Sequence, residues 1–161
     1  THKVSFTLDI LNSVSQSFVG RSIAKSDHLV GATAQVFHVL GFVVLLASVL
    51  LINLRLLGAG LREQSARQLA GETNLLAWLG LTSAILSGII MFFSAVELYY
   101  FNPAFQLKIL LLLGAVVLQL TWFKWVISRD GVSQSVVRSS AVISLLLWFG
   151  VGAAGRAIGF V

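Results

Sequence analysis

The chain has 161 residues, of which 57% are hydrophobic and 11% are charged, with a net charge of +5. A soluble domain carries about 25% charged residues, so the composition predicts an integral membrane protein with one all-α membrane domain over residues 1–161. The absence of cysteine excludes disulfides, thiolate metal sites and a cysteine nucleophile. The basic residues lie at the ends of apolar runs, where they anchor helices at the interface, so their charge does not predict nucleic-acid binding.

The first segment, residues 4–19, is too polar to cross a bilayer. Val4, Leu8, Leu11 and Phe18 nevertheless fall on one helical stripe, and polar residues lie off it. This pattern predicts an N-terminal amphipathic helix that lies in the membrane interface with its apolar face toward the lipid.

Four apolar runs follow, at about residues 29–57, 75–99, 104–127 and 136–156. Each is long enough for a helix to cross a hydrocarbon core of about 30 Å, which needs roughly 20 apolar residues. Asn102 and Pro103 have the residue types of an N-cap and a first helical position, so they mark the start of the third helix. The expected fold is a four-helix bundle in the lipid bilayer.

Orientation follows from the basic residues near the short loops. The loop after the first spanning helix has Arg55, Arg62 and Arg67 in it or at its edges, and the loop after the third has Lys124, Arg129 and Arg138. The tight turn between the second and third helices has none. Because short cytoplasmic loops are rich in lysine and arginine, both loops are expected in the cytoplasm and both termini outside.

The first spanning helix carries a histidine, His38, well inside its apolar run. An ionisable ring at that depth needs a partner, which makes it a candidate functional residue. Glycine and alanine lie at Gly31, Ala34 and Gly41 on the same helical face, which leaves room for a neighbouring helix or a flat ligand. The alternative is a packing histidine that hydrogen-bonds across the bundle.

Haem b is the candidate cofactor for this position, because a histidine and a thioether on facing helices can ligate haem iron. His38 is the candidate metal ligand. The candidate second ligand is Met91, at a similar depth, or the His38 of a neighbouring subunit across a two-fold axis. Lys108 and Arg156 are candidate contacts for the haem propionates. The alternatives are that methionine fills a core gap and that both cations reach the interface along their aliphatic stems.

Two further ionisable residues are expected toward the same side. His28 lies ten residues before His38, about 280° around the helix, so the two histidines do not share a face within one subunit. Glu97 can carry protons, bind an ion or pair with Lys108 or Arg156, and pairing is the ordinary expectation. The chain has no hydrolytic or nucleotide-binding motif, so enzymatic activity is not predicted beyond a redox role.

Small residues recur at Gly80, Ala84 and Gly88 along the second spanning helix. Such a seam lets another helix approach closely, which predicts a homo-oligomer or a complex with other membrane subunits. Three functions stay open: a haem-binding electron-transfer or cytochrome-like subunit, a non-catalytic accessory subunit of a membrane complex, and a small transporter or channel.

Three motifs also occur in order: FHVLG…LRLLG at Phe37–Gly58, FNPAFQLK at Phe101–Lys108 and GRAIGF at Gly155–Phe160. With these motifs, the chain from about Ser22 to its end resembles a family of small bacterial four-helix inner-membrane proteins, a domain of unknown function. The resemblance implies a multi-pass protein of the bacterial inner membrane. It also implies that His38, Arg55, Lys108 and Arg156 stand at motif positions, and it supplies no activity.

Overall fold

The computed structural model describes residues 9, 13, 28–60 and 63–160. Its elements in chain order are α3 (His28–Leu57), α4 (Ala66–Ser94), α5 (Val96–Tyr100), α6 (Pro103–Leu118), the π-helical turn η1 (Gln119–Phe123), α7 (Lys124–Ser128), α8 (Gln134–Ala157) and the 3-10 turn η2 (Ile158–Phe160). No strand occurs in these ranges, which confirms the all-α fold. The predicted interfacial helix at residues 4–19 lies outside the described residues, apart from the helical Asp9 and Ser13.

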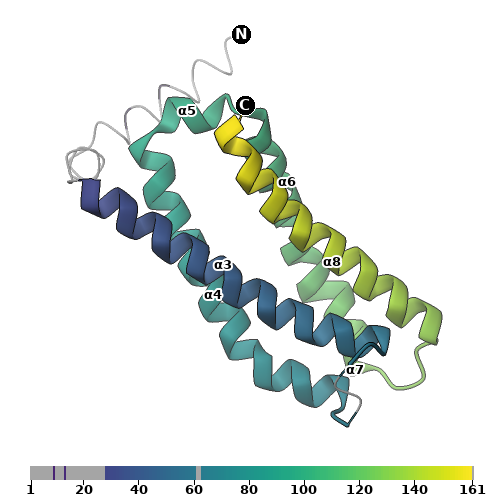
Figure 1. The fold of residues 1–161 in the computed structure, drawn as a ribbon. Helices are drawn as coiled ribbons and strands as arrows, with labels where there is room; N and C mark the ends of the chain where they lie inside the picture. The colour runs from purple at the N-terminus through teal and green to yellow at the C-terminus, as the bar shows by residue number, and fades with distance from the viewer. Residues whose placement is uncertain (1–8, 10–12, 14–27, 61–62, 161) are drawn as a thin grey trace.

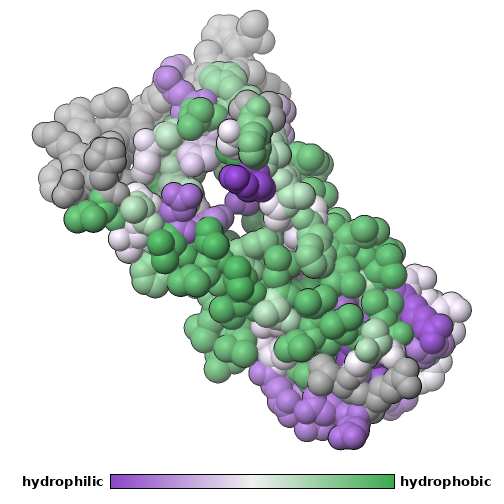
Figure 2. All heavy atoms as spheres, viewed as in Figure 1, coloured by the Kyte–Doolittle hydropathy of each residue, from purple (hydrophilic) through white to green (hydrophobic). Residues whose placement is uncertain are grey.

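Within the described residues, four helical segments are long and apolar enough to cross a membrane: Leu29–Leu57, Ala66–Ser94, Pro103–Ser128 and Gln134–Phe160. Many of their large apolar side chains face outward; Leu110 and Leu146, for example, are each 68% exposed. Figure 2 shows this apolar surface over the middle of the molecule, with hydrophilic residues gathered toward its ends. A bilayer makes such a surface favourable, and with four helices of spanning length the chain is a multi-pass membrane protein.

The second spanning helix, α4, begins at Ala66 and not near residue 75 as the apolar run suggested. The Ser65 side chain caps it by accepting a hydrogen bond of 3.1 Å from the backbone N–H of Gln68. The Gln68 amide in turn donates to Glu72 Oε1 at 2.9 Å, one turn further on. These polar contacts extend the helix beyond the apolar run, because caps and side-chain pairs one turn apart stabilise exposed helical turns.

The helices form two antiparallel pairs, α3 with α4 and α6 with α8, and α3 also packs along α8 (Figure 1). One cluster of buried side chains, at the middle of the bundle, includes Leu45, Leu81 and Trp148. A second, nearer the loop between α3 and α4, includes Ile52 and Phe123. The two pairs are therefore joined mainly through α3 and α8.

The small-residue seam of α4 packs against α3 of the same chain. A Cβ atom added to Gly80 would lie 2.6 Å from the carbonyl oxygen of Gly41, and one added to Gly41 would lie 2.8 Å from the oxygen of Gly80. Both positions require glycine because the two backbones touch. Since the seam is occupied within the chain, the predicted homo-oligomer or partner subunit needs another face, and it stays a prediction.

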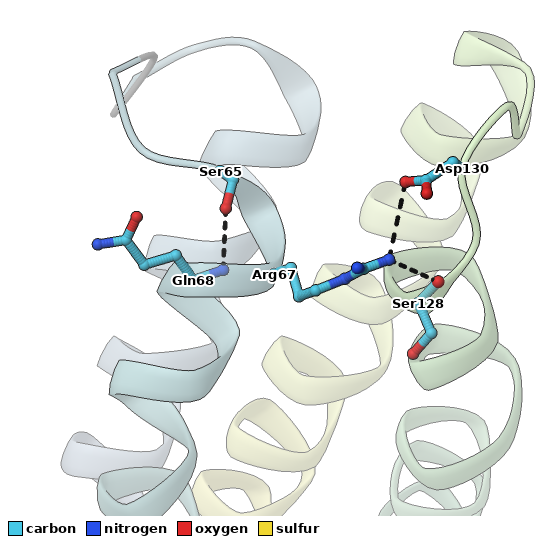
Figure 3. A network of polar contacts seen from close by, with 5 residues as sticks. All are labelled: Ser65, Arg67, Gln68, Ser128 and Asp130. Atoms are coloured by element: carbon cyan, nitrogen blue, oxygen red, sulfur yellow. Dashed lines mark hydrogen bonds and ion pairs between the residues drawn. The ribbon is translucent and has the colours of Figure 1, made fainter.

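Polar contacts join the two pairs at the end that carries α7 (Figure 3). Arg67 at the start of α4 donates to the carbonyl oxygen of Ser128 at 2.7 Å and lies 3.7 Å from the Asp130 carboxylate. Both side chains of this ion pair are exposed, so the pair adds little stability by itself. Hydrophilic side chains of this kind are typical of residues at a membrane surface, which is where this end of the bundle lies.

Candidate functional site

The candidate site begins with His38, which projects from α3 toward α4. Its Nδ1 atom lies 2.8 Å from the carbonyl oxygen of Ala84 and 3.3 Å from Ser87 Oγ. A carbonyl oxygen can only accept, so Nδ1 carries the hydrogen and Nε2 has the lone pair. The Ser87 hydroxyl donates to the carbonyl of Ser83 at 2.6 Å, which leaves its lone pairs toward the ring.

The imidazole fits at this point because Gly88 has no side chain. A Cβ atom there would lie 3.1 Å from Cε1 and 3.4 Å from Nδ1 of His38. The seam on α4 thus has two uses: Gly80 admits the α3 backbone, and Gly88 admits the ring of His38 two turns further along.

The second member of the site, Lys108, comes from α6. Its Nζ atom lies 3.1 Å from Nε2 of His38. Since Nε2 has the lone pair in this tautomer, the lysine donates and the histidine accepts. The stem of Lys108 lies against α8, where a Cβ atom on Gly155 would be 3.5 Å from its Cε and Nζ atoms. The Lys108–His38 pair therefore lies where all four spanning helices meet.

The Lys108–His38 pair is half-buried and lies within two spanning segments. In residues 28–60 and 63–160, the only ion pair between a basic and an acidic side chain is Arg67 with Asp130. No described carboxylate therefore neutralises Lys108, and its partner is an imidazole that accepts a hydrogen bond without supplying negative charge.

The position of Lys108 depends on the start of α6. Asn102 is 5% exposed, and its Oδ1 caps the helix by accepting from the backbone N–H of Phe105 at 3.1 Å. Its Nδ2 donates to the carbonyl oxygen of Ile158 at 3.1 Å, which ties the start of α6 to η2. The sequence predicted the cap but not this second contact, because the asparagine and its acceptor are far apart in the chain.

The other predicted site residues do not join the pair. Arg156 is exposed and its guanidinium lies 5.1 Å above the ring of Phe160. Glu97 is exposed on α5, and Arg55 donates to the carbonyl oxygen of Gln64 in the loop after α3. His28 begins α3, and its side chain lies outside the described part of the structure.

The arrangement fits only part of a haem site. A ring whose Nδ1–H donates to a backbone carbonyl is oriented as metal-bound histidines commonly are. However, Lys108 occupies the Nε2 atom that would bind iron. Met91 belongs to α4, the helix that accepts the Nδ1 hydrogen bond, whereas iron at Nε2 would lie on the opposite side of the ring. The described residues contain no group of three or more His, Cys, Asp or Glu side chains able to hold a metal ion.

The sequence did not single out the backbone carbonyl of Ala84 or the side chain of Ser87 as partners of His38. A backbone carbonyl that accepts a hydrogen bond leaves no signal in the sequence. Ser87 has the same side chain as the other serines of α4, and only its position along the helix places it beside His38.

Comparison with known proteins places the chain in a family. No curated protein and no solved structure shows a significant match to it. Residues 10–161 match the family described as "Family of unknown function (DUF6644)", a match that covers all four spanning helices and the Lys108–His38 pair. The chain therefore belongs to the family of unknown function DUF6644.

Proposed function

We propose that the protein binds a lipid-soluble molecule bearing a carboxylate, and that the Lys108–His38 pair holds that carboxylate within the bilayer. The observation that carries the proposal is the hydrogen bond from Lys108 Nζ to His38 Nε2, with no described acidic side chain beside it. A cation in this environment is costly unless an anion meets it. A carboxylate ligand supplies that anion.

Lysine has the donors to make this contact. Its ammonium group has three N–H bonds, of which one points to His38, so two remain for a ligand. The neutral imidazole orients the ammonium group without cancelling its charge. Hydrogen bonds between a charged donor and a charged acceptor are about twice as strong as neutral ones, so a carboxylate gains most from this site.

Access to the site is available from the side of the bundle. Figure 2 shows an opening between the helices in the half of the molecule nearest the C-terminus, with strongly hydrophilic atoms on its rim. His38, Lys108 and Gly155 belong to that half, since they lie toward the start of α3, the start of α6 and the end of α8. We propose that a ligand dissolved in the bilayer enters through this opening, on the way to the ammonium group, without crossing the packed middle of the bundle.

Haem b is the redox-active member of this ligand class, because it carries two propionate carboxylates. Its specific support is the Nδ1–H bond from His38 to Ala84, which aims Nε2 away from α4. In that case His38 would hold the group and Lys108 would leave Nε2 to bind a propionate. Electron transfer is the function that such a group would supply.

Localisation and orientation belong to the same proposal. The family resemblance and the basic loops support the bacterial inner membrane, with the loops after α3 and α7 in the cytoplasm and both termini outside. The Lys108–His38 pair would then lie in the outer half of the bilayer.

The experiment measures binding of oleate, a simple carboxylate amphiphile, to the purified protein in nanodiscs, with protein-free nanodiscs as the blank. We expect saturable binding at one oleate per chain, weakened at least tenfold by Lys108→Met, since a hydrogen bond to a charged group contributes about 1.5–3 kcal/mol. Lys124→Met is the matched control, because Lys124 is an exposed lysine on α7. Equal loss in both variants, or no binding above the blank, would contradict the proposal.

A parallel titration with haemin distinguishes binding of haem from binding of lipid-soluble carboxylates in general. A Soret band that His38→Ala abolishes supports a haem protein. Oleate binding without any Soret band supports a carboxylate-binding protein with no redox role. If neither probe binds, an accessory subunit or a transporter replaces the proposal.

A further inference from the structure

The Lys108–His38 pair has a second chemical capability, because a lysine side chain is also a nucleophile. A primary amine attacks carbon through the lone pair of its uncharged form. An ammonium ion without an anion is costly within a bilayer, and no described acidic side chain pairs with Lys108. The uncharged amine avoids this cost, so Lys108 without a bound anion favours the form that can react.

The arrangement around the amine is that of a nucleophile and its base. Nζ of Lys108 lies 3.1 Å from Nε2 of His38, within the range of about 2.6–3.2 Å typical of such pairs. The backbone carbonyl of Ala84 accepts from Nδ1 at 2.8 Å, which orients the ring and leaves the Nε2 lone pair toward the amine. A nucleophile, a base and a third group that orients the base are the diagnostic arrangement of covalent catalysis.

Lys108 is held in place without being sealed off. Its stem lies against α8, where a Cβ atom on Gly155 would be 3.5 Å from Cε and Nζ. Contacts with the histidine and with α8 restrict the amine to a narrow range of positions, which lowers the entropic cost of a reaction there. Lys108 and His38 are both partly exposed, in contrast to the fully buried residues of the core.

We propose that Lys108 forms a reversible imine with a lipid-soluble aldehyde, and that His38 is the base that moves the protons. An aldehyde is uncharged and dissolves in the bilayer, so it can approach an amine that lies within the spanning helices. Its carbonyl carbon carries a hydrogen, which leaves it more open to attack than the carbon of a ketone.

The reaction balances without any further reagent. The Nζ lone pair forms a bond to the aldehyde carbon, and the C=O bond opens to an alkoxide. Nε2 of His38 accepts a proton from Nζ and passes it to that oxygen, which gives a carbinolamine. A second proton leaves Nζ by the same route as the C–O bond breaks, so the oxygen departs as water and a C=N bond remains. Nothing is oxidised or reduced, and addition of water reverses the steps.

This activity uses the same two residues as the proposed carboxylate site but does not need a carboxylate ligand. The ammonium form of Lys108 binds a carboxylate, whereas its uncharged form attacks an aldehyde. Imine formation is measured without oleate, so a failure of oleate binding leaves that result intact. Oleate binding is likewise measured without aldehyde, so the two proposals can fail separately.

The test is trapping of the imine that decanal, a simple lipid-soluble aldehyde, forms on the full chain. The nanodiscs contain phosphatidylcholine, whose headgroup has no primary amine. Sodium cyanoborohydride reduces the imine to a stable secondary amine, and peptide mass spectrometry follows the rate at each lysine. We expect alkylation of Lys108 at least tenfold faster than that of Lys124, since a positioned base contributes about 10²–10⁴-fold. Lys124 is the matched lysine on the same chain, because it is exposed on α7.

His38→Gln separates the base from the nucleophile. Glutamine keeps polar atoms in the side chain but cannot take up a proton, so we expect the rate at Lys108 to fall at least tenfold while the rate at Lys124 stays unchanged. Equal rates at Lys108 and Lys124 in the wild-type chain would overturn the proposal, and this comparison needs no variant to fold. An unchanged Lys108 rate in a folded His38→Gln variant would overturn it too, because His38 would then not act as the base.

Discussion

Gly41 of α3 and Gly80 of α4 touch backbone to backbone, since a Cβ atom on Gly80 would lie 2.6 Å from the Gly41 carbonyl oxygen. This contact sets the distance between the two helices. It also fixes the position along the two helices at which the ring of His38, just before Gly41 on α3, contacts Gly88 on α4. The close crossing is therefore a condition for the Lys108–His38 pair as well as for the fold.

The first prediction is that Gly80→Ala destabilises the protein by about 1–3 kcal/mol, because overpacking forces the α3 and α4 backbones apart. The measurement is the free energy of unfolding in detergent, followed by helical circular dichroism. Gly71→Ala is the control in the same helix, because nothing lies within 4 Å of the Cβ that it adds. Equal stability of the two variants would show that the crossing is looser than described.

The second prediction concerns the ring of His38. Gly88→Ala places a methyl group 3.1 Å from Cε1 of a ring that is hydrogen-bonded at both nitrogens. We expect this variant to weaken oleate binding several-fold while the helical content stays unchanged. Gly155→Ala adds its methyl group at an ordinary contact distance of 3.5 Å from Lys108, so we expect near-normal binding. The reverse order of affinities would argue against the placement of the ring on Gly88.

The third prediction separates the two roles of Asn102. Asn102→Ala removes both the N-cap of α6 and the contact with Ile158, and we expect a loss of about 1–2 kcal/mol in the free energy of unfolding. Asn102→Asp keeps a side-chain oxygen for the cap but replaces the amide donor. It should therefore retain part of the stability, and thermal denaturation of the two variants side by side measures the difference. If the aspartate variant matched the alanine variant, the retained cap oxygen would not outweigh the loss of the amide donor to Ile158.

The fourth prediction is the orientation in the membrane. The chain has no cysteine, so single cysteines can be introduced without a background. Cysteines at the exposed Glu63 and Asp130 should resist a membrane-impermeant thiol reagent added to intact cells, whereas one at the exposed Phe101 should react. The basic residues of the two loops are the reason for this expectation. Labelling in the opposite pattern would invert the topology.

The number and type of helices could be predicted from the sequence, because run length and apolar content alone decide whether a segment can cross a bilayer. The start of α6 could also be predicted from the sequence, since an asparagine followed by proline has the chemistry of a helix cap. The apolar run predicts a later start for α4 than Ala66, because it does not register the side-chain contacts that hold the polar first turns in the helix. His38 could also be identified as a candidate, because an ionisable ring in an apolar run is costly without a partner.

Only the tertiary structure shows which groups are the hydrogen-bond partners of His38. Residues 38, 84 and 108 lie on three helices, and their hydrogen bonds depend on helix rotation and crossing, which local sequence leaves open. In the same packing, Arg156 faces outward and lies over the ring of Phe160, and the small-residue seam of α4 contacts α3 of the same chain. It also left Trp148 Nε1 and Gln119 Oε1 buried without a hydrogen-bond partner among the described residues. Hydrophobicity selects the segments that enter the membrane, but lipid does not distinguish one apolar face from another, so close contacts and hydrogen bonds decide how the faces pair.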